Sequence, residues 1–248
     1  MNLDAFLGLL QFSDGLFPAG SYAHSFGLES YVTEGIIRDA AGVESFLLSY
    51  LQGSVAPTDV VAAIASRKAA LPSRYGGIER CGGIERPAGM ERCADIDRTL
   101  DALKPASELR DASRQMGRQV LRVASNLSEP FASQGLTADL FRAVENQETP
   151  GHHAMAFGAV GAALGWAEKE MACAYLYATC AGLAAATLRL LALGQLAGQR
   201  ILWALAPSIT KLAEDVQGKD MADVWSFAPG IEIAAMRHAT LDARLFRS

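Results

Sequence analysis

Apolar residues recur along most of this chain at the three- and four-residue spacing of an α-helix, and stretches of strict alternation are scarce. Turn-forming residues such as Pro18 and Gly20 separate the apolar runs. The pattern predicts helices over residues 6–13, 21–35, 42–55, 57–70, 107–122, 171–188 and 199–205. We therefore expect an all-α fold, a compact single-domain helical bundle of about ten helices spanning residues 1–248.

Residues 72–97 break the helical pattern. GGIERC, GGIERP and AGMERC are copies of one hexapeptide, and together they span residues 76–93. A six-residue period fits neither a helix nor a strand, and glycine and proline disfavour both. We expect a mobile surface insert over residues 72–97, with metal capture by Cys81 and Cys93 as the minor alternative.

Small residues form a stripe on the helix predicted at 171–188. They recur at four-residue intervals: Ala174, Ala178, Gly182 and Ala186. Small side chains aligned in this way let two helix backbones approach closely. We predict that this stripe lies at a helix crossing inside the bundle or at the interface of a dimer.

Composition narrows the range of functions. Half of the 248 residues are hydrophobic, and the net charge of −5 comes with no basic block, so nothing indicates nucleic acid. The start of the chain lacks a basic signal region, and no cysteine pair has zinc-ligand spacing, so we expect a cytoplasmic protein. Residues 171–188 carry no charge and just reach the length of a membrane span, but their Ala and Gly content favours a buried central helix. A membrane-associated helical protein is kept as an alternative.

Arginines line one side of the helix predicted at 107–122, at positions Arg110, Arg114, Arg118 and Arg122. Such a stripe either binds an acidic partner or phosphate, or forms a solvated face that acids of the same helix balance. The second interpretation is the commoner one for a helix with acidic residues nearby.

No constellation in the sequence predicts catalysis. GQLAGQR at residues 194–200 lacks the ending of a phosphate-binding loop, and no nucleophile elbow is present. Ser21, His24 and Ser25 are close in sequence, but adjacency does not make a catalytic triad. The four histidines form no helical metal-binding pair, so we predict no catalytic residue and no metal site. A small-molecule enzyme of unknown type, using His24 and the Gly-rich helices, is the other alternative.

Three stretches together resemble the UreF family of urease accessory proteins. They are LLQFSDGLFPAGSYAHSFGLES at residues 9–30, LRLLALGQLAGQRIL at 188–202, and MRHATLDARLFRS at 236–248. SELRDASRQMGRQVLR at residues 107–122 is a fourth, weaker match. Ordered motifs at plausible separations are more specific than any one motif alone.

The resemblance implies a function in protein assembly. It implies an all-α homodimer that binds UreD, also called UreH, and with it recruits the GTPase UreG. That assembly would place nickel in apo-urease, with nickel and GTP handled by the partner proteins. The resemblance thus implies no cofactor bound by this chain, no nucleic acid and no membrane among its partners.

Partner-binding residues are predicted mainly in the C-terminal tail, residues 231–248, which mixes apolar side chains with arginines. The tail residues are Arg237, His238, Leu241, Arg244, Leu245, Phe246 and Arg247. A second group comes from the N-terminal motif: Tyr22, His24, Ser25 and Glu29. The alternative is a tail packed on its own domain, in which Tyr22 and Glu29 are packing and capping residues.

Overall fold

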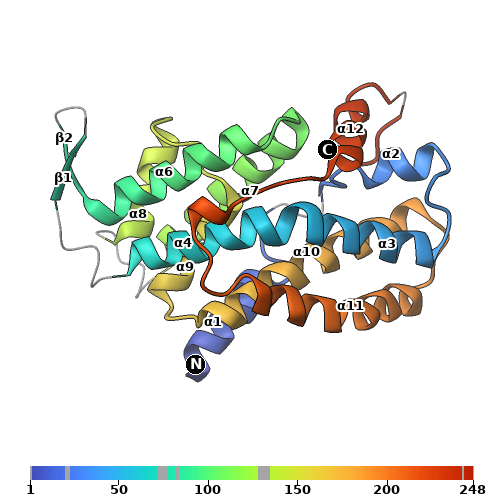
Figure 1. Cartoon of the computed structure of the whole chain (residues 1–248), viewed down its shortest axis with the longest axis horizontal. Helices are drawn as coiled ribbons and strands as arrows, with labels where there is room; N and C mark the ends of the chain where they lie inside the picture. Colours follow the sequence, from blue (N-terminus) through green and yellow to red (C-terminus); the bar gives the residue numbers. More distant parts are fainter. Residues whose placement is uncertain are drawn as a thin grey trace.

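Helices make up most of the computed structural model, which describes residues 2–19, 23–71, 78–81, 84–127, 135–241 and 243–247. The predicted all-α class is confirmed (Figure 1). The helices before the hexapeptide repeats are α1 (Leu3–Ser13), α2 (Leu28–Thr33), α3 (Ala40–Tyr50), the π-helix η2 (Leu51–Val60) and α4 (Val61–Ala70). Those after them are α6 (Ala88–Leu103), α7 (Ser107–Asn126), α8 (Leu136–Glu145), α9 (His153–Ala163), α10 (Glu168–Leu190), α11 (Gln195–Asp215), the short 3-10 helix η3 (Met221–Asp223) and α12 (Pro229–His238).

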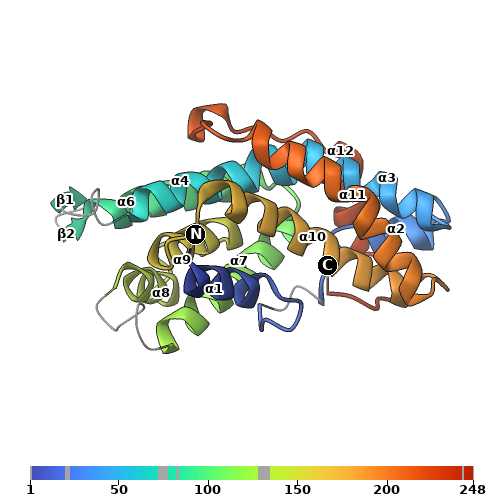
Figure 2. The ribbon, with the colours of Figure 1, turned by 90° about the horizontal axis from the view of Figure 1, so that it is seen from below.

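Helix α10 lies at the centre of the structure, where α1, α3 and α11 all pack against it (Figure 2). Its side chains Met171, Leu176 and Cys180 belong to a buried cluster that extends from α1 to α12. By length and composition α10 is the one described helix apolar enough to cross a membrane, yet half of its most apolar window is buried inside the fold. This is the packing expected of the predicted central helix.

Pro57 was expected to separate two helices, but it lies inside the continuous run α3–η2–α4. Proline has no N–H to donate, and the wider π-turn accommodates its ring. The extended segment after η3 supplies donors from outside, because Phe227 N–H donates to Gly53 O at 2.7 Å and Trp225 N–H to Pro57 O at 3.4 Å. A Cβ atom on Gly53 would lie 2.7 Å from the Phe227 carbonyl oxygen, so this close approach requires glycine.

Two very close backbone approaches in the bundle involve glycines outside the predicted stripe. A Cβ atom on Gly158 of α9 would lie 2.1 Å from Ala63 O of α4, and one on Gly117 of α7 would lie 2.2 Å from Gly151 O. The stripe on α10 is divided between three environments. Ala174 borders an outer groove, Ala178 and Gly182 border an inner cavity, and Ala186 is buried.

The hexapeptide repeats adopt more regular structure than the sequence predicts. Strands β1 (Ile78–Cys81) and β2 (Ile84–Pro87) pair antiparallel, and the third repeat already belongs to α6. Met90, Cys93 and Ile96 of α6 are buried in the main core. The predicted boundary of the insert at residue 97 is therefore too late, because helix α6 begins at Ala88. Residues 72–77 and 82–83 lie outside the described part of the chain, as do 1, 20–22, 128–134, 242 and 248.

Candidate functional site

Two of the sequence motifs, more than 200 residues apart, meet where α2 packs against α12 (Figure 1). Ser30 Oγ donates to Ala234 O at 2.8 Å. Gly27 has φ of +86°, and a Cβ atom there would lie 3.0 Å from Ile231 O, so glycine suits this position on both counts. We call the contact between residues 23–30 and residues 231–247 the clasp.

The carboxylate of Glu29 lies at the centre of the clasp and is 3% exposed. His238 Nε2 donates to Glu29 Oε2 at 2.7 Å, which places the ring proton on Nε2. Leu245 N–H donates to Glu29 Oε1 at 2.6 Å, and Phe246 N–H donates to Glu29 Oε2 at 3.1 Å. A buried carboxylate is expensive unless donors surround it, and three donors of the C-terminal segment meet that need.

The third motif joins the clasp through Arg189 of α10. Its guanidinium carbon lies 4.6 Å from the centroid of the buried Phe246 ring, a cation–π contact. Arg247 N–H donates to Ala23 O at 2.8 Å, which ties the end of the described chain to the N-terminal motif. All three stretches that carry the family resemblance therefore meet at one place.

The clasp also sets the charge state of a histidine. Burial, together with the Arg247 guanidinium, lowers the pKa of His24 from 6.5 to about 4, so His24 is neutral at pH 7. The His24 ring lies against Phe26 in a tilted arrangement, and Phe26 has a left-handed backbone with φ of +50°. A positive φ is uncommon for an aromatic residue and marks local strain between the N-terminal motif and α2.

The structure divides the predicted partner-binding residues into two groups. The buried ones are His24, Ser25, Glu29, His238 and Phe246. The exposed or half-exposed ones are Arg237, Leu241, Arg244, Leu245 and Arg247. Tyr22 lies outside the described residues. The buried group makes the internal contacts of the clasp, and the exposed group leaves arginines around Leu245 at the surface.

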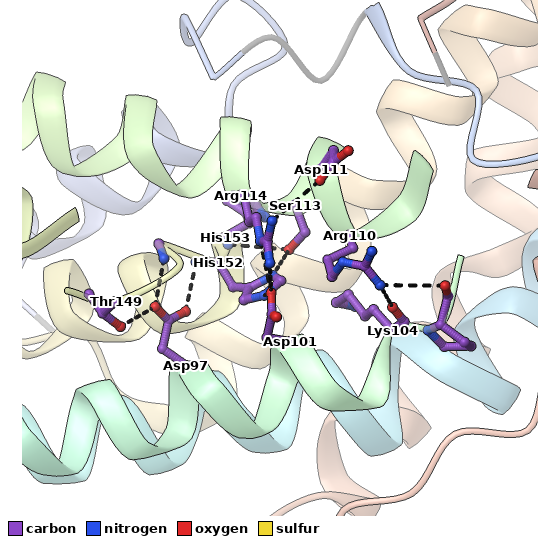
Figure 3. A network of polar contacts seen from close by, with 12 residues as sticks. Asp97, Asp101, Lys104, Arg110, Asp111, Ser113, Arg114, Thr149, His152 and His153 are labelled. Carbon is purple, nitrogen blue, oxygen red and sulfur yellow. Dashed lines mark hydrogen bonds and ion pairs between the residues drawn. The ribbon is translucent and has the colours of Figure 1, made fainter. Parts of the chain in front are cut away.

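A second polar cluster, which the sequence reasoning missed, lies between α6, α7 and the α8–α9 connection (Figure 3). Asp97 is fully buried. Its carboxylate accepts from Gly151 N–H at 2.6 Å, from His152 N–H at 2.7 Å and from Thr149 Oγ1 at 2.6 Å. Asp97 therefore fixes the backbone just before α9. No local pattern around Asp97 indicates this role, because its partners lie more than fifty residues away.

Ser113, His152 and Asp101 in this cluster match the residue types of a catalytic triad. Ser113 Oγ lies 3.0 Å from His152 Nδ1, and His152 Nε2 lies 3.0 Å from Asp101 Oδ1 (Figure 3). Burial opposes ionisation of Asp101, but hydrogen bonds from Arg114 and His152 outweigh it and lower its pKa. Ser113 lies within helix α7 and is buried, and its Oγ already accepts from His153 N–H at 3.4 Å. The trio therefore connects α6, α7 and the start of α9.

An inner cavity of about 80 Å³ borders Ser113 and the stripe residues Ala178 and Gly182. Its charged wall is the ion pair between Lys104 Nζ and Asp59 Oδ1, 2.8 Å apart and about nine-tenths buried. That volume accommodates a few ordered water molecules beside Ser113.

The arginine stripe of α7 is largely balanced within the protein. Arg118 pairs with Glu145 at 2.6 Å, Arg114 pairs with Asp101, and Arg110 donates to Lys104 O. For these three arginines most acceptors come from other segments, not from acids of the same helix as the sequence predicts. Among the described residues, no group of three or more His, Cys, Asp or Glu side chains could hold a metal ion.

Taken together, the fold and the clasp define an all-α protein whose C-terminal segment packs against residues 23–30 beside exposed arginines and Leu245. The family model for UreF matches residues 37–206. The urease accessory protein UreF of Paenarthrobacter aurescens (strain TC1) is 31% identical over 243 residues, which cover 98% of this chain and 97% of the relative. The urease accessory protein UreF of Trichodesmium erythraeum (strain IMS101) is 32% identical over 97% of this chain and 95% of the relative. The chain belongs to the UreF family of urease accessory proteins.

Proposed function

We propose that this protein is a non-catalytic scaffold of urease maturation. Together with UreD it recruits the GTPase UreG, and the assembly inserts nickel into apo-urease. In this proposal the partners handle nickel and GTP, this chain binds no cofactor, and the assembly works in the cytoplasm. Membership of the UreF family supports the general role.

The observation that carries the proposal is the exposed rim of the clasp. Arg244, Leu245 and Arg247 are exposed, while the residues that fix their backbone are buried. Arginine presents a rigid fork of donors that suits carboxylates, and arginines beside apolar side chains are common anchors of protein interfaces. The rim therefore suits an acidic surface of UreD that also has an apolar recess.

Point variants test the rim better than truncation does. Deleting residues 237–248 would remove His238, which is fully buried, and would confuse folding with binding. We expect Arg244→Glu with Arg247→Glu to weaken the capture of UreD by about thirtyfold or more, and to lose UreG as a consequence. Arg122→Glu, an exposed arginine of α7, is the matched control and should bind normally.

Affinity capture of purified UreD and UreG, with and without GTP and nickel, gives the readout. Circular dichroism must show that each variant keeps its helices. Capture of both partners by the folded double variant would place the UreD interface elsewhere and end the proposal for this rim.

The expected homodimer fits a different face, formed by α1 and α10. An open apolar groove there is bordered by Phe6, Leu10, Ala174 and Tyr177. Phe6, Leu10 and Tyr177 are each about half exposed, which is unusual for neighbouring large apolar residues on a monomer surface. We propose that a second copy of the chain covers this groove.

Tyr177→Glu should give a folded monomer, because the new charge would be buried in the dimer without a partner. Light scattering after size exclusion measures the mass. Trp203→Ser on α11, where the ring is 83% exposed, is the control and should remain dimeric. A dimer with unchanged affinity in Tyr177→Glu would move the interface away from α1 and α10.

A further inference from the structure

Two large aromatic side chains point outward from the segment that joins η3 to α12. Residues 224–228, which we call the strap, run along the helices α3, η2 and α4 (Figure 1). Trp225 is 48% exposed and Phe227 is 75% exposed, whereas Ser226 between them is half-buried and Ala228 is buried. This alternation is that of an extended chain, which places the side chains of residues i and i+2 on one side, about 7 Å apart.

Helix η2 is built to hold the strap. Pro57 has no N–H to donate to Gly53 O, as the residue four positions on does in an α-helix, and Phe227 N–H donates to that oxygen at 2.7 Å. The missing side chain of Gly53 lets the strap backbone approach. Thr58 Oγ1 donates to Trp225 O at 2.6 Å. The backbone under both exposed rings is therefore fixed from below.

The chain around the strap is acidic. Residues 220–232 contain three acids and no base. Asp223, two positions before Trp225, is exposed and forms a capping box with Asp220, in which Asp223 Oδ2 accepts from Asp220 N–H at 3.0 Å. A carboxylate, an indole and a phenyl ring thus follow one another at alternate exposed positions. Both carboxylates and the faces of aromatic rings attract cations.

Trp203 on α11 shows why exposure alone does not carry this argument. Its ring is 83% exposed, more than that of Trp225. Residues 195–211 around it contain Arg200 and Lys211 but no acid. The molecule therefore offers an exposed tryptophan among acids and another among bases, which serves as an internal control.

We propose that Asp223, Trp225 and Phe227 form a receptor for a cationic side chain, and that a basic segment of a protein partner docks on the strap. The inference goes beyond the proposed function, because it adds a second surface with the opposite charge preference. The rim of the clasp presents arginines, whereas the strap accepts arginine or lysine from the partner.

Titration with N-acetyl-arginine amide tests the receptor without any partner protein. Nuclear magnetic resonance follows the indole N–H signals, with the neutral N-acetyl-glutamine amide as the matched ligand. We expect the arginine compound to shift the signal of Trp225 at least about threefold more than that of Trp203. Equal shifts of the two signals, or equal effects of the two compounds, would overturn the inference.

Asp223→Asn isolates the charge of the receptor, because the amide oxygen can still accept from Asp220 N–H. The shift of Trp225 with N-acetyl-arginine amide should fall by about half or more. Asp95→Asn, which removes an exposed carboxylate of α6, should leave it unchanged. A full response in the folded Asp223→Asn variant would contradict a role for the carboxylate.

Cross-linking tests the docking of a partner. Phe227 is replaced by the photoreactive p-benzoylphenylalanine, and the full chain is assembled with purified UreD, UreG and apo-urease. We expect a cross-link to a segment of one of these proteins that contains arginine or lysine. A cross-link to a second copy of this chain, to a segment without a base, or to no protein would overturn the docking.

Thr58→Val tests whether the seat on η2 positions the rings. Thr58 is 1% exposed and touches no partner, and valine keeps its shape but cannot donate to Trp225 O. We expect faster hydrogen exchange at the Phe227 amide and about threefold less cross-linking, with the helix content unchanged. Thr187→Val is the matched control, because Thr187 is equally buried and donates to Leu183 O within α10. An equal loss in both variants would reduce Thr58 to general packing and contradict a seat that positions the rings.

The outcomes separate this inference from the proposed function. If the strap shows no preference for the arginine compound while Arg244→Glu with Arg247→Glu loses UreD, the inference fails alone. If those rim variants bind UreD normally while Trp225 still responds to the arginine compound, the proposed function fails at the rim and the receptor stands.

Discussion

Asp97 on α6 and Glu29 on α2 perform similar chemistry at opposite ends of the molecule (Figure 1). Each buried carboxylate accepts from two backbone N–H groups and one side chain. Asp97 holds a connection between two helices of the core. Glu29 holds residues 243–247, the C-terminal turn, beside exposed arginines. The same arrangement of donors thus fixes a helix–helix connection in one region and a terminal segment in the other.

The largest expected effect comes from removing the carboxylate of the core. Asp97→Ala leaves Gly151 N–H, His152 N–H and the Thr149 hydroxyl without their acceptor. We expect the free energy of unfolding to fall by about 3–5 kcal/mol, since a buried polar network loses its shared partner. Chemical denaturation monitored by circular dichroism measures the change.

Two further variants make this comparison quantitative. Asp95→Ala removes an exposed carboxylate of the same helix and should change stability by no more than about 0.5 kcal/mol. Glu29→Ala should fall between the two, at about 1–3 kcal/mol, because the freed turn can swing into water and hydrate its amides. A loss as large as that of Asp97→Ala would mean that the turn is part of the core.

Each of the two regions contains a buried histidine whose protonation can be compared. Burial lowers the pKa of His153, beside the Asp97 cluster, from 6.5 to about 4. The unfolded chain therefore binds the proton first as the pH falls, so stability drops below pH 6.5 and continues to drop towards pH 4. Between pH 7 and 5 this amounts to about 2 kcal/mol for one such histidine. His153→Asn should remove that part of the dependence.

His24 in the clasp has the same low pKa, but Arg247 contributes to it. Arg247→Gln should therefore raise the pKa of His24 and leave that of His153 where it is. Nuclear magnetic resonance titration of the two imidazoles gives both values in one experiment. Equal movement of both pKa values would show that Arg247 acts through the whole fold, and the contrast between the two regions would not hold.

The sequence predicted the helical fold because burial in a bundle imposes a period that a single chain displays. The prediction failed where tertiary contacts outweighed a local sequence preference. Pro57 was expected to restart the chain, but it lies inside a helix, as does Pro207 of α11. The third hexapeptide repeat was assigned to a mobile insert, but Met90 and Cys93 are buried in the core. Local propensity is a weak guide once packing supplies the energy.

In the sequence the two parts of the clasp are separate motifs, and nothing indicates that they are in contact. Glu29 and His238 were predicted to bind a partner, with packing inside the protein as the alternative. Both side chains are buried and bond each other. No local pattern reports a contact between residues 209 positions apart. Asp97 left no signal at all, because a lone carboxylate on an amphipathic helix resembles any solvated acid.

The smallest expected effect concerns Arg189, through which the third motif contacts Phe246 of the C-terminal turn. Arg189 is exposed, so its cation–π contact with Phe246 should contribute about 0.5–1 kcal/mol. Arg189→Ala should lower the free energy of unfolding by no more than that. In a double-mutant cycle with Phe246→Leu, the coupling energy should have the same size, because leucine keeps the buried volume but loses the ring. Arg189→Ala should also make the amides of Leu245 and Phe246 exchange faster. The amides of Gly151 and His152, which Asp97 holds, should exchange at the wild-type rate. A coupling energy of zero would mean that the backbone hydrogen bonds to Glu29 and Ala23 hold the turn and that the third motif meets the clasp without stabilising it.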